Sequence, residues 1–136
     1  MLDPPLHEFL PKSNNEINDV AVSLNIPVKE LEVRISELHE QNPMLGHRGC
    51  RLAISFPEIY EMQCRAIFEA LAECKKQKIH STMPEIMIPL VSTEAEIKIM
   101  KDLVISVAKK VQDENKIKIE FLVGTMIELP RAAIKA

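Results

Sequence analysis

Two short apolar runs constrain the fold of this 136-residue chain more than any other feature. They are residues 86–91 (IMIPLV) and residues 119–127 (IEFLVGTMI). Short runs of this kind are typical of strands buried on both faces, which occur in parallel sheets. A stretch with helical periodicity separates the two runs, and strands that alternate with helices form parallel βαβ units. We therefore predict an α/β fold.

Helix signals surround both runs. Thr93 and Glu96 have the spacing of a capping box, and apolar residues at helical spacing continue to about Val111. Pro57 opens another long helix that reaches about Gln77. We expect its apolar stripe to face the core; it comprises Ile59, Met62, Ala66, Ile67, Ala70, Leu71 and Cys74.

The first third of the chain has a different pattern. Prolines predict an extended loop over residues 4–11. Ser13 or Asn14 then caps a helix to about residue 24, and Pro27 opens a second helix to about residue 41, so residues 13–41 form a helical hairpin. Residues 42–52 (NPMLGHRGCRL) contain two glycines and a proline and predict a structured loop.

The chain begins directly before a Pro-Pro pair and stops just after a new helix begins at Pro130. We therefore expect residues 1–136 to be a single fragment of one domain. In this interpretation the hairpin of residues 13–41 is an insert, and residues 42–136 form the βα units.

Composition excludes several classes of protein. The net charge is −3, without the basic stripe that nucleic-acid binding needs. No run approaches the roughly 20 apolar residues of a membrane helix, and the first residues lack the pattern of a secretion signal. The three cysteines include no CxxC pair, so neither a disulfide framework nor a zinc site is indicated. We expect a cytoplasmic location with no membrane or nucleic-acid partner.

Glu128 follows the second apolar run directly. The carboxyl ends of parallel strands carry the functional groups of α/β folds, so Glu128 is a candidate metal ligand or substrate-facing group. Alternatively, it caps the helix that begins near Pro130. Met126 lies on the same side of an extended strand and could either form an apolar wall beside this carboxylate or pack in the core.

Arg48 lies between Gly46 and Gly49 in the predicted loop. Its guanidinium matches the planar carboxylate or the phosphate of a small anion, such as phosphoenolpyruvate (PEP). It could equally pair with a nearby carboxylate of the protein. His47 and Cys50, in the same loop, are interpreted as structural residues.

Four blocks of sequence together resemble the pyruvate phosphate dikinase family of PEP-utilising enzymes. In order they are LDPPLHEFLP at residues 2–11, NPMLGHRGCRL at 42–52, PEIMIPLV at 84–91 and GTMIELPRAA at 124–133. The resemblance implies a part of a C-terminal (β/α)₈ TIM barrel, about βα units three to five with the helical hairpin inserted. Enzymes of this family interconvert ATP, phosphate and pyruvate with AMP, diphosphate and PEP.

Carried onto this sequence, the resemblance implies that Arg48 binds PEP or pyruvate, that Met126 makes an apolar contact and that Glu128 binds Mg²⁺. The family's other substrate arginines, its second metal carboxylate, its acid cysteine and its phosphohistidine have no counterpart here. We therefore expect a chain that is inactive alone and that either self-associates or pairs with complementary segments of the same enzyme.

Three functional interpretations remain open at this point. The chain can be a portion of a pyruvate phosphate dikinase, or of a related enzyme similar to PEP synthase. It can be a binding module that complements separately encoded segments. It can also be a remnant without a biochemical role.

Overall fold

The structure is a computed structural model that describes residues 1–3 and 5–136, except for the side chain of Pro43. The chain divides into two compact units. One comprises Met1–Asp3 and Gly49–Ala136, and the other comprises Pro4–Arg48.

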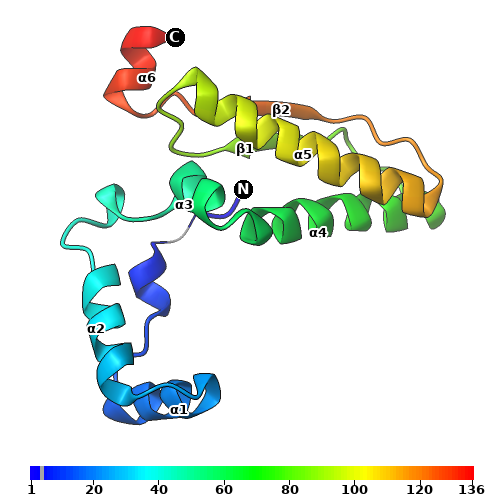
Figure 1. The fold of residues 1–136 in the computed structure, drawn as a ribbon. Coiled ribbons are helices and arrows are strands. Elements are labelled where there is room, and N and C mark those ends of the chain that lie inside the picture. Colours follow the sequence, from blue (N-terminus) through cyan, green and yellow to red (C-terminus); the bar gives the residue numbers. More distant parts are fainter. Residues whose placement is uncertain (4) are drawn as a thin grey trace. The chain divides into compact units, whose positions relative to one another are not determined.

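The larger unit contains a parallel strand pair and four helices (Figure 1). Ile86 lies opposite Val123 and Ile88 lies opposite Thr125 in the parallel register. The predicted α/β class with parallel strands joined through a helix is confirmed. In chain order the elements are α3 (Gly49–Ser55), α4 (Pro57–Lys76), β1 (Glu85–Ile88), α5 (Glu94–Asn115), β2 (Leu122–Thr125) and α6 (Pro130–Lys135).

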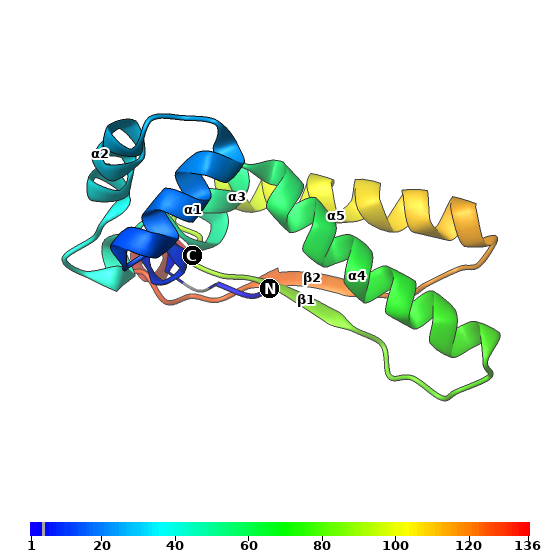
Figure 2. The same cartoon turned by 90° about the horizontal axis from the view of Figure 1, so that it is seen from below.

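Helices α4 and α5 form one layer, and they cover one face of the strand pair (Figure 2). Apolar side chains fill the space between the layers, and Arg65 of α4 forms an ion pair with Glu114 of α5 at the outer surface. Burying this apolar surface is the main favourable term in folding the unit. The core comprises Cys50, Ala53, Tyr60, Cys64, Phe68, Ile86, Ile88, Val91, Met100, Val104, Val107, Ala108, Val111 and Ile119.

The strands differ from the prediction in length and in burial. Each has four residues, and each has one covered face. In β1, Ile86 and Ile88 are buried whereas Met87 is 47% exposed, and in β2 Leu122 is 52% exposed. The expectation of strands buried on both faces is therefore wrong for the described chain, because helices pack against one side of the pair.

Helix α4 begins at Pro57 as predicted, and its predicted stripe is confirmed in part, because Ile59, Ile67 and Leu71 pack against the core. The predicted stripe included Met62, which is 64% exposed. Tyr60 and Phe68 are buried instead, and the Phe68 ring packs edge-to-face on Phe121 with ring centroids 4.9 Å apart. Aromatic side chains bury more apolar surface than Met or Ala, so their burial determines the rotation of the helix.

Helix α5 agrees with its prediction. Thr93 Oγ1 accepts a hydrogen bond from the Glu96 amide, and the Glu96 carboxylate accepts one from the Thr93 amide at 2.7 Å, which completes the capping box. The inward residues Met100, Val104 and Val111 are fully buried.

Residues 49–52 are helical rather than part of a loop, and they form the first turn of α3. The amide of Cys50 donates to the carbonyl oxygen of Pro89 at 3.1 Å, so a contact from a distant part of the sequence orients this turn. Gly49 and its neighbours give little local signal for a helix because glycine is a weak helix former.

The smaller unit is a helical hairpin with short 3₁₀ turns. It consists of η1 (Leu6–Phe9), α1 (Asn14–Leu24), α2 (Val28–Leu38) and η2 (Pro43–Leu45). Ser13 and Glu16 form a capping box at the start of α1, and Ala21 and Leu31 are buried.

Two predictions for this unit need correction. The expected extended segment of residues 4–11 contains the helical turn η1, while Pro4 lies outside the described residues. Pro27 is the residue before α2 rather than its first residue, and α2 ends at Leu38 instead of near residue 41.

We predict that Phe68→Ala will lower the free energy of unfolding by about 3–5 kcal/mol, because it removes a buried ring from the core. The matched control is Met62→Ala on the exposed face of α4, for which the change should stay within about 0.5 kcal/mol. Urea unfolding followed by circular dichroism measures both. Equal losses would mean that α4 presents the stripe predicted from the sequence.

Candidate functional site

The carboxyl ends of β1 and β2 lie at the same edge of the sheet because the strands are parallel. Two hydrogen bonds tie the ends together. The Thr125 hydroxyl donates to the carbonyl oxygen of Ile88 at 2.8 Å, and the amide of Met126 donates to the same oxygen at 3.3 Å. The turns that follow the two strands therefore start side by side.

Glu128 lies in the turn after β2 and contacts the turn after β1. Its Oε1 accepts a hydrogen bond from the backbone N–H of Leu90 at 2.7 Å. Glu128 itself is exposed, whereas Leu90 is only 2% exposed. The structure thus anchors an accessible carboxylate on a buried part of the backbone.

Leu90 has a left-handed backbone conformation, with φ of 59°. For a residue that has a side chain, the left-handed conformation costs about 1–2 kcal/mol relative to the right-handed one. Burial of the leucine side chain offsets this cost. Such outliers often mark functional turns, since the surrounding structure must hold them in place.

The start of α3 packs against this turn. Cys50 Sγ donates to the carbonyl oxygen of Leu90 at 3.2 Å, in addition to the bond between the Cys50 amide and Pro89. Gly49 has φ of 58°, and a Cβ atom added to it would lie 2.9 Å from Leu90 Cδ1. Only glycine fits at position 49 without displacing the leucine.

The geometry brings two of the candidate residues to one edge. Glu128 and Met126 both follow β2, and Met126 is 42% exposed, so its side chain does not pack in the core of this unit. Arg48 belongs to the smaller unit, where its Nη1 lies 3.8 Å from the sulfur of Met44.

Comparison with known proteins gives a consistent result. The sequence model for the PEP-binding domain of PEP-utilising enzymes matches residues 1–136. The chain belongs to this family. It is 57% identical over 136 residues to pyruvate, phosphate dikinase of Rhizobium meliloti, and 48% identical over 135 residues to that of Clostridium symbiosum. It is 50% identical over 138 residues to the chloroplastic pyruvate, phosphate dikinase 1 of Arabidopsis thaliana.

These matches cover nearly all of this chain but only a small share of the relatives. The chain spans 15% of the Rhizobium and Clostridium proteins and 14% of the Arabidopsis protein. It therefore corresponds to a portion of a pyruvate, phosphate dikinase, as the sequence blocks predicted.

The described residues do not bring together the ligands that a magnesium ion needs. No group of three or more His, Cys, Asp or Glu side chains gathers within the described part of the chain. Mg²⁺ requires near-octahedral coordination by hard oxygen ligands. Glu128 supplies one carboxylate and can be at most one member of such a set.

Leu90 is the part of this edge that the sequence did not reveal. Residue type gives no signal for a leucine with positive φ, since few residues other than glycine and asparagine favour it. Gly49 did carry a signal, because it is one of the two glycines that predicted a structured loop over residues 42–52, and its positive φ is a conformation that glycine favours.

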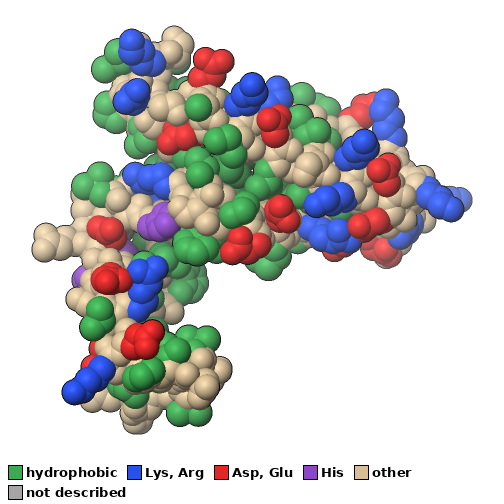
Figure 3. All heavy atoms as spheres, viewed as in Figure 1, with side chains coloured by type: hydrophobic (Ala, Val, Ile, Leu, Met, Phe, Trp, Pro, Cys, Tyr) green, Lys and Arg blue, Asp and Glu red, His purple; other side chains and the backbone are tan. Residues whose placement is uncertain are grey.

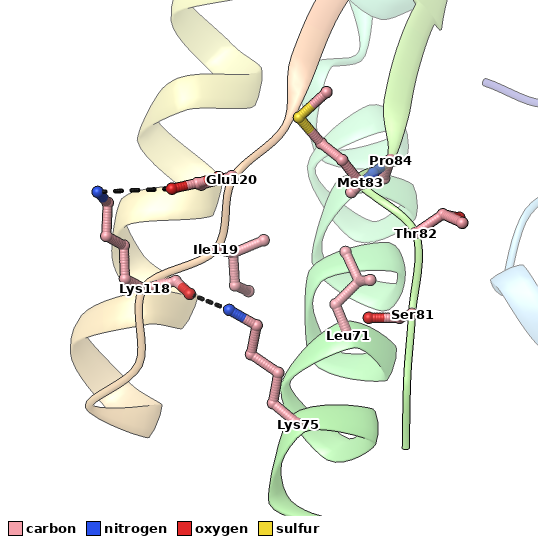
Figure 4. Close-up of a pocket in the computed structure, with 9 residues that line it drawn as sticks. All are labelled: Leu71, Lys75, Ser81, Thr82, Met83, Pro84, Lys118, Ile119 and Glu120. Atoms are coloured by element: carbon pink, nitrogen blue, oxygen red, sulfur yellow. Dashed lines mark hydrogen bonds and ion pairs between the residues drawn. The ribbon is translucent and has the colours of Figure 1, made fainter. Parts of the chain in front are cut away.

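Two hollows lie near the ends of the strands. One, of about 320 Å³, lies at their amino ends, and its lining includes Leu71 and Ile119 (Figure 4). Beside it, the ammonium of Lys75 donates a hydrogen bond to the carbonyl oxygen of Lys118. The other, of about 500 Å³, lies at the carboxyl ends between the start of α5 and α6. Its lining includes Ser92, Thr93, Ile97, Thr125, Ile127 and Arg131.

Acidic and basic side chains are interspersed over α5 on the face that Figure 3 shows. Among the described residues, no helix is both long enough and apolar enough to cross a membrane.

The thiols of Cys50 and Cys64 are buried. Burial raises the pKa of each from 9.0 to about 11. The thiolate is the nucleophile, so little of it is present at neutral pH. We predict slow alkylation of both residues in the folded chain and faster alkylation of the half-buried Cys74.

Timed reaction with iodoacetamide at pH 7.5, followed by peptide mass spectrometry, measures the three rates. The raised pKa values also have a consequence for stability. The folded chain favours the neutral thiols, so their contribution to stability is complete below pH 9 and is lost as the pH rises through about 11. Fast labelling of Cys50 at pH 7.5 would contradict the packing against Leu90.

Proposed function

We propose that this chain forms part of the PEP/pyruvate site of a pyruvate, phosphate dikinase and that Arg48, Met126 and Glu128 face the substrate. The observation that carries the proposal is the position of Glu128. It is an accessible carboxylate at the carboxyl edge of a parallel strand pair, in a chain whose full length matches the PEP-binding domain. That edge is where α/β enzymes bind their substrates.

Each residue has a role that fits its chemistry. The guanidinium of Arg48 can bind the carboxylate or phosphoryl oxygens of PEP through two parallel hydrogen bonds. Transfer of the phosphoryl group leaves the enolate of pyruvate, and a fixed cation stabilises that negative charge as it forms. Met126 provides apolar contact beside the small substrate.

We also propose that Glu128 contributes one carboxylate to a magnesium site whose other ligands come from other segments of the enzyme. Its bond to Leu90 occupies Oε1, and a carboxylate has further lone pairs for a second partner. Because the described residues offer no complete ligand set, the proposal assigns this chain no metal-dependent step of its own.

The proposed architecture is a segment of a (β/α)₈ barrel, about βα units three to five, with residues 13–41 as an inserted helical hairpin. Two observations support it. The face of β1 and β2 that the helices leave open carries Met87 and Leu122 beside Glu85 and Gly124, and the apolar pair suits a filled barrel interior. The Met1 ammonium also donates to the carbonyl oxygen of Met87 at 2.9 Å, so the edge of β1 that does not pair with β2 accepts hydrogen bonds from another segment, as it would in a barrel.

The whole enzyme would interconvert ATP, phosphate and pyruvate with AMP, diphosphate and PEP in the cytoplasm. We propose that this chain alone is inactive, since it carries one candidate substrate arginine and one candidate metal carboxylate.

A chimeric enzyme tests the proposal. Residues 1–136 replace the matching segment of the Rhizobium meliloti enzyme, to which they are 57% identical, and formation of PEP or pyruvate is measured. We predict an active chimera in which Arg48→Ala or Glu128→Ala lowers kcat by about 100-fold or more, because each removes a group that acts on the reacting charge. Glu120→Ala, an exposed substitution before β2, is the matched control and should retain full activity.

Activity that survives both Arg48→Ala and Glu128→Ala would refute the assigned roles. An inactive but folded chimera would favour a remnant, and activity restored only by mixing this chain with the remaining segments would favour a complementing module.

We predict that the isolated chain self-associates or forms a loosely folded monomer. The open face and edges of the strand pair expose Met87, Leu122 and Met126, and such surfaces pair with other chains. Size-exclusion chromatography with light scattering measures the mass over a range of concentrations. A compact monomer that unfolds cooperatively would contradict the prediction.

A further inference from the structure

The left-handed turn at Leu90 is held by groups from two other segments of the same unit. Glu128 accepts the hydrogen bond of its N–H at 2.7 Å, and Cys50 Sγ donates to its carbonyl oxygen at 3.2 Å. Gly49 lies against the leucine side chain. A single residue thus connects the start of α3 with the turn that carries Glu128.

The contact with Gly49 leaves no spare room. A Cβ atom at position 49 would lie 2.9 Å from Cδ1, 3.0 Å from Cβ and 3.1 Å from Cγ of Leu90. The leucine is buried, so little free space surrounds its side chain and it cannot move away easily. A methyl group at this position therefore displaces Leu90, and the N–H that binds Glu128 moves with it.

We propose that Gly49 and Cys50 are positioning residues that orient the carboxylate of Glu128 through the backbone of Leu90. The inference rests on the proposed function of Glu128 in the substrate and metal site. The Leu90 N–H fixes one carboxylate oxygen, and this fixes the direction in which the other oxygen points. Gly49 and Cys50 fix the orientation of the Leu90 backbone, which carries this donor, although neither one contacts Glu128.

A merely structural role for Gly49 would predict a general loss of stability without a specific effect on Glu128. The two roles separate in a double-mutant cycle, since residues that act through one another give non-additive effects. The chimeric enzyme described above provides the activity, and Gly49→Ala is combined with Glu128→Ala. The control is Glu120→Ala, an exposed substitution before β2.

We expect Gly49→Ala to lower kcat by about 10-fold or more, since small misplacements of a catalytic group have large effects on rate. In the Glu128→Ala background it should cause no further loss. Glu120→Ala should leave kcat unchanged. Equal losses from Gly49→Ala with and without Glu128 would overturn the proposal.

Amide hydrogen exchange gives a readout that does not require activity. In the chimeric enzyme, with exchange located by mass spectrometry of fragmented peptides, the Leu90 amide should exchange slowly, and Glu128→Ala should accelerate it at least 10-fold by removing its acceptor. Gly49→Ala should accelerate the same amide while the β1 and α5 amides stay protected. Glu120→Ala should have no effect on the Leu90 amide.

Cys50 supplies a second pair of variants if Gly49→Ala disrupts folding. Cys50→Ser keeps a donor for the Leu90 carbonyl oxygen, whereas Cys50→Ala removes it, and both shorten the side chain at the same site. Faster Leu90 exchange and lower kcat in Cys50→Ala, with recovery in Cys50→Ser, support positioning. The positioning inference would be overturned if the Leu90 amide exchanged at the same rate in Gly49→Ala, in Cys50→Ala and in the unsubstituted chimera.

The two hypotheses fail in different ways. If Glu128→Ala leaves activity unchanged, the proposed function fails, even if the exchange data show that Gly49 and Cys50 control the Leu90 amide. If Glu128→Ala abolishes activity but the exchange rate of the Leu90 amide does not change in the Gly49 and Cys50 variants, the proposed function stands and the positioning inference fails.

Discussion

Packing of α4 and α5 against one face of β1 and β2 is the interaction on which the larger unit depends. A parallel pair of four-residue strands is too small to be stable alone. The helices supply the missing apolar surface, with Phe68 from α4 and Met100 from α5 buried in the same core as Ile88. Since this packing aligns the two strands, it also brings their carboxyl ends together.

The same one-sided packing leaves alternate residues of the strands exposed, among them Met87 and Leu122. In a family whose members are about six to seven times longer than this chain, that open face is consistent with a surface that the rest of the enzyme covers. The proposed barrel provides such a cover. It would also turn the carboxyl edge of the strands into the floor of a substrate pocket.

The edge itself depends on backbone groups as much as on side chains. Glu128 is the candidate functional carboxylate, but the donor that holds it belongs to Leu90, and the conformation of Leu90 depends on Gly49 and Cys50. Three segments that are far apart in the sequence meet at one peptide unit. This arrangement explains why glycine occupies position 49, where a helix-forming residue would otherwise be expected to start α3.

The sequence by itself determined the order of the longer elements, the capping box at Thr93, the start of α4 at Pro57 and the family, because these depend on local hydrogen bonds, periodicity and long sequence blocks. Only the tertiary structure decided which face of α4 is buried, that the strands are covered on one side, and that Leu90 binds Glu128. Those features depend on contacts between distant segments, and a helix that is apolar around much of its circumference does not specify its own rotation. A leucine likewise adopts positive φ only when its neighbours in space hold it there.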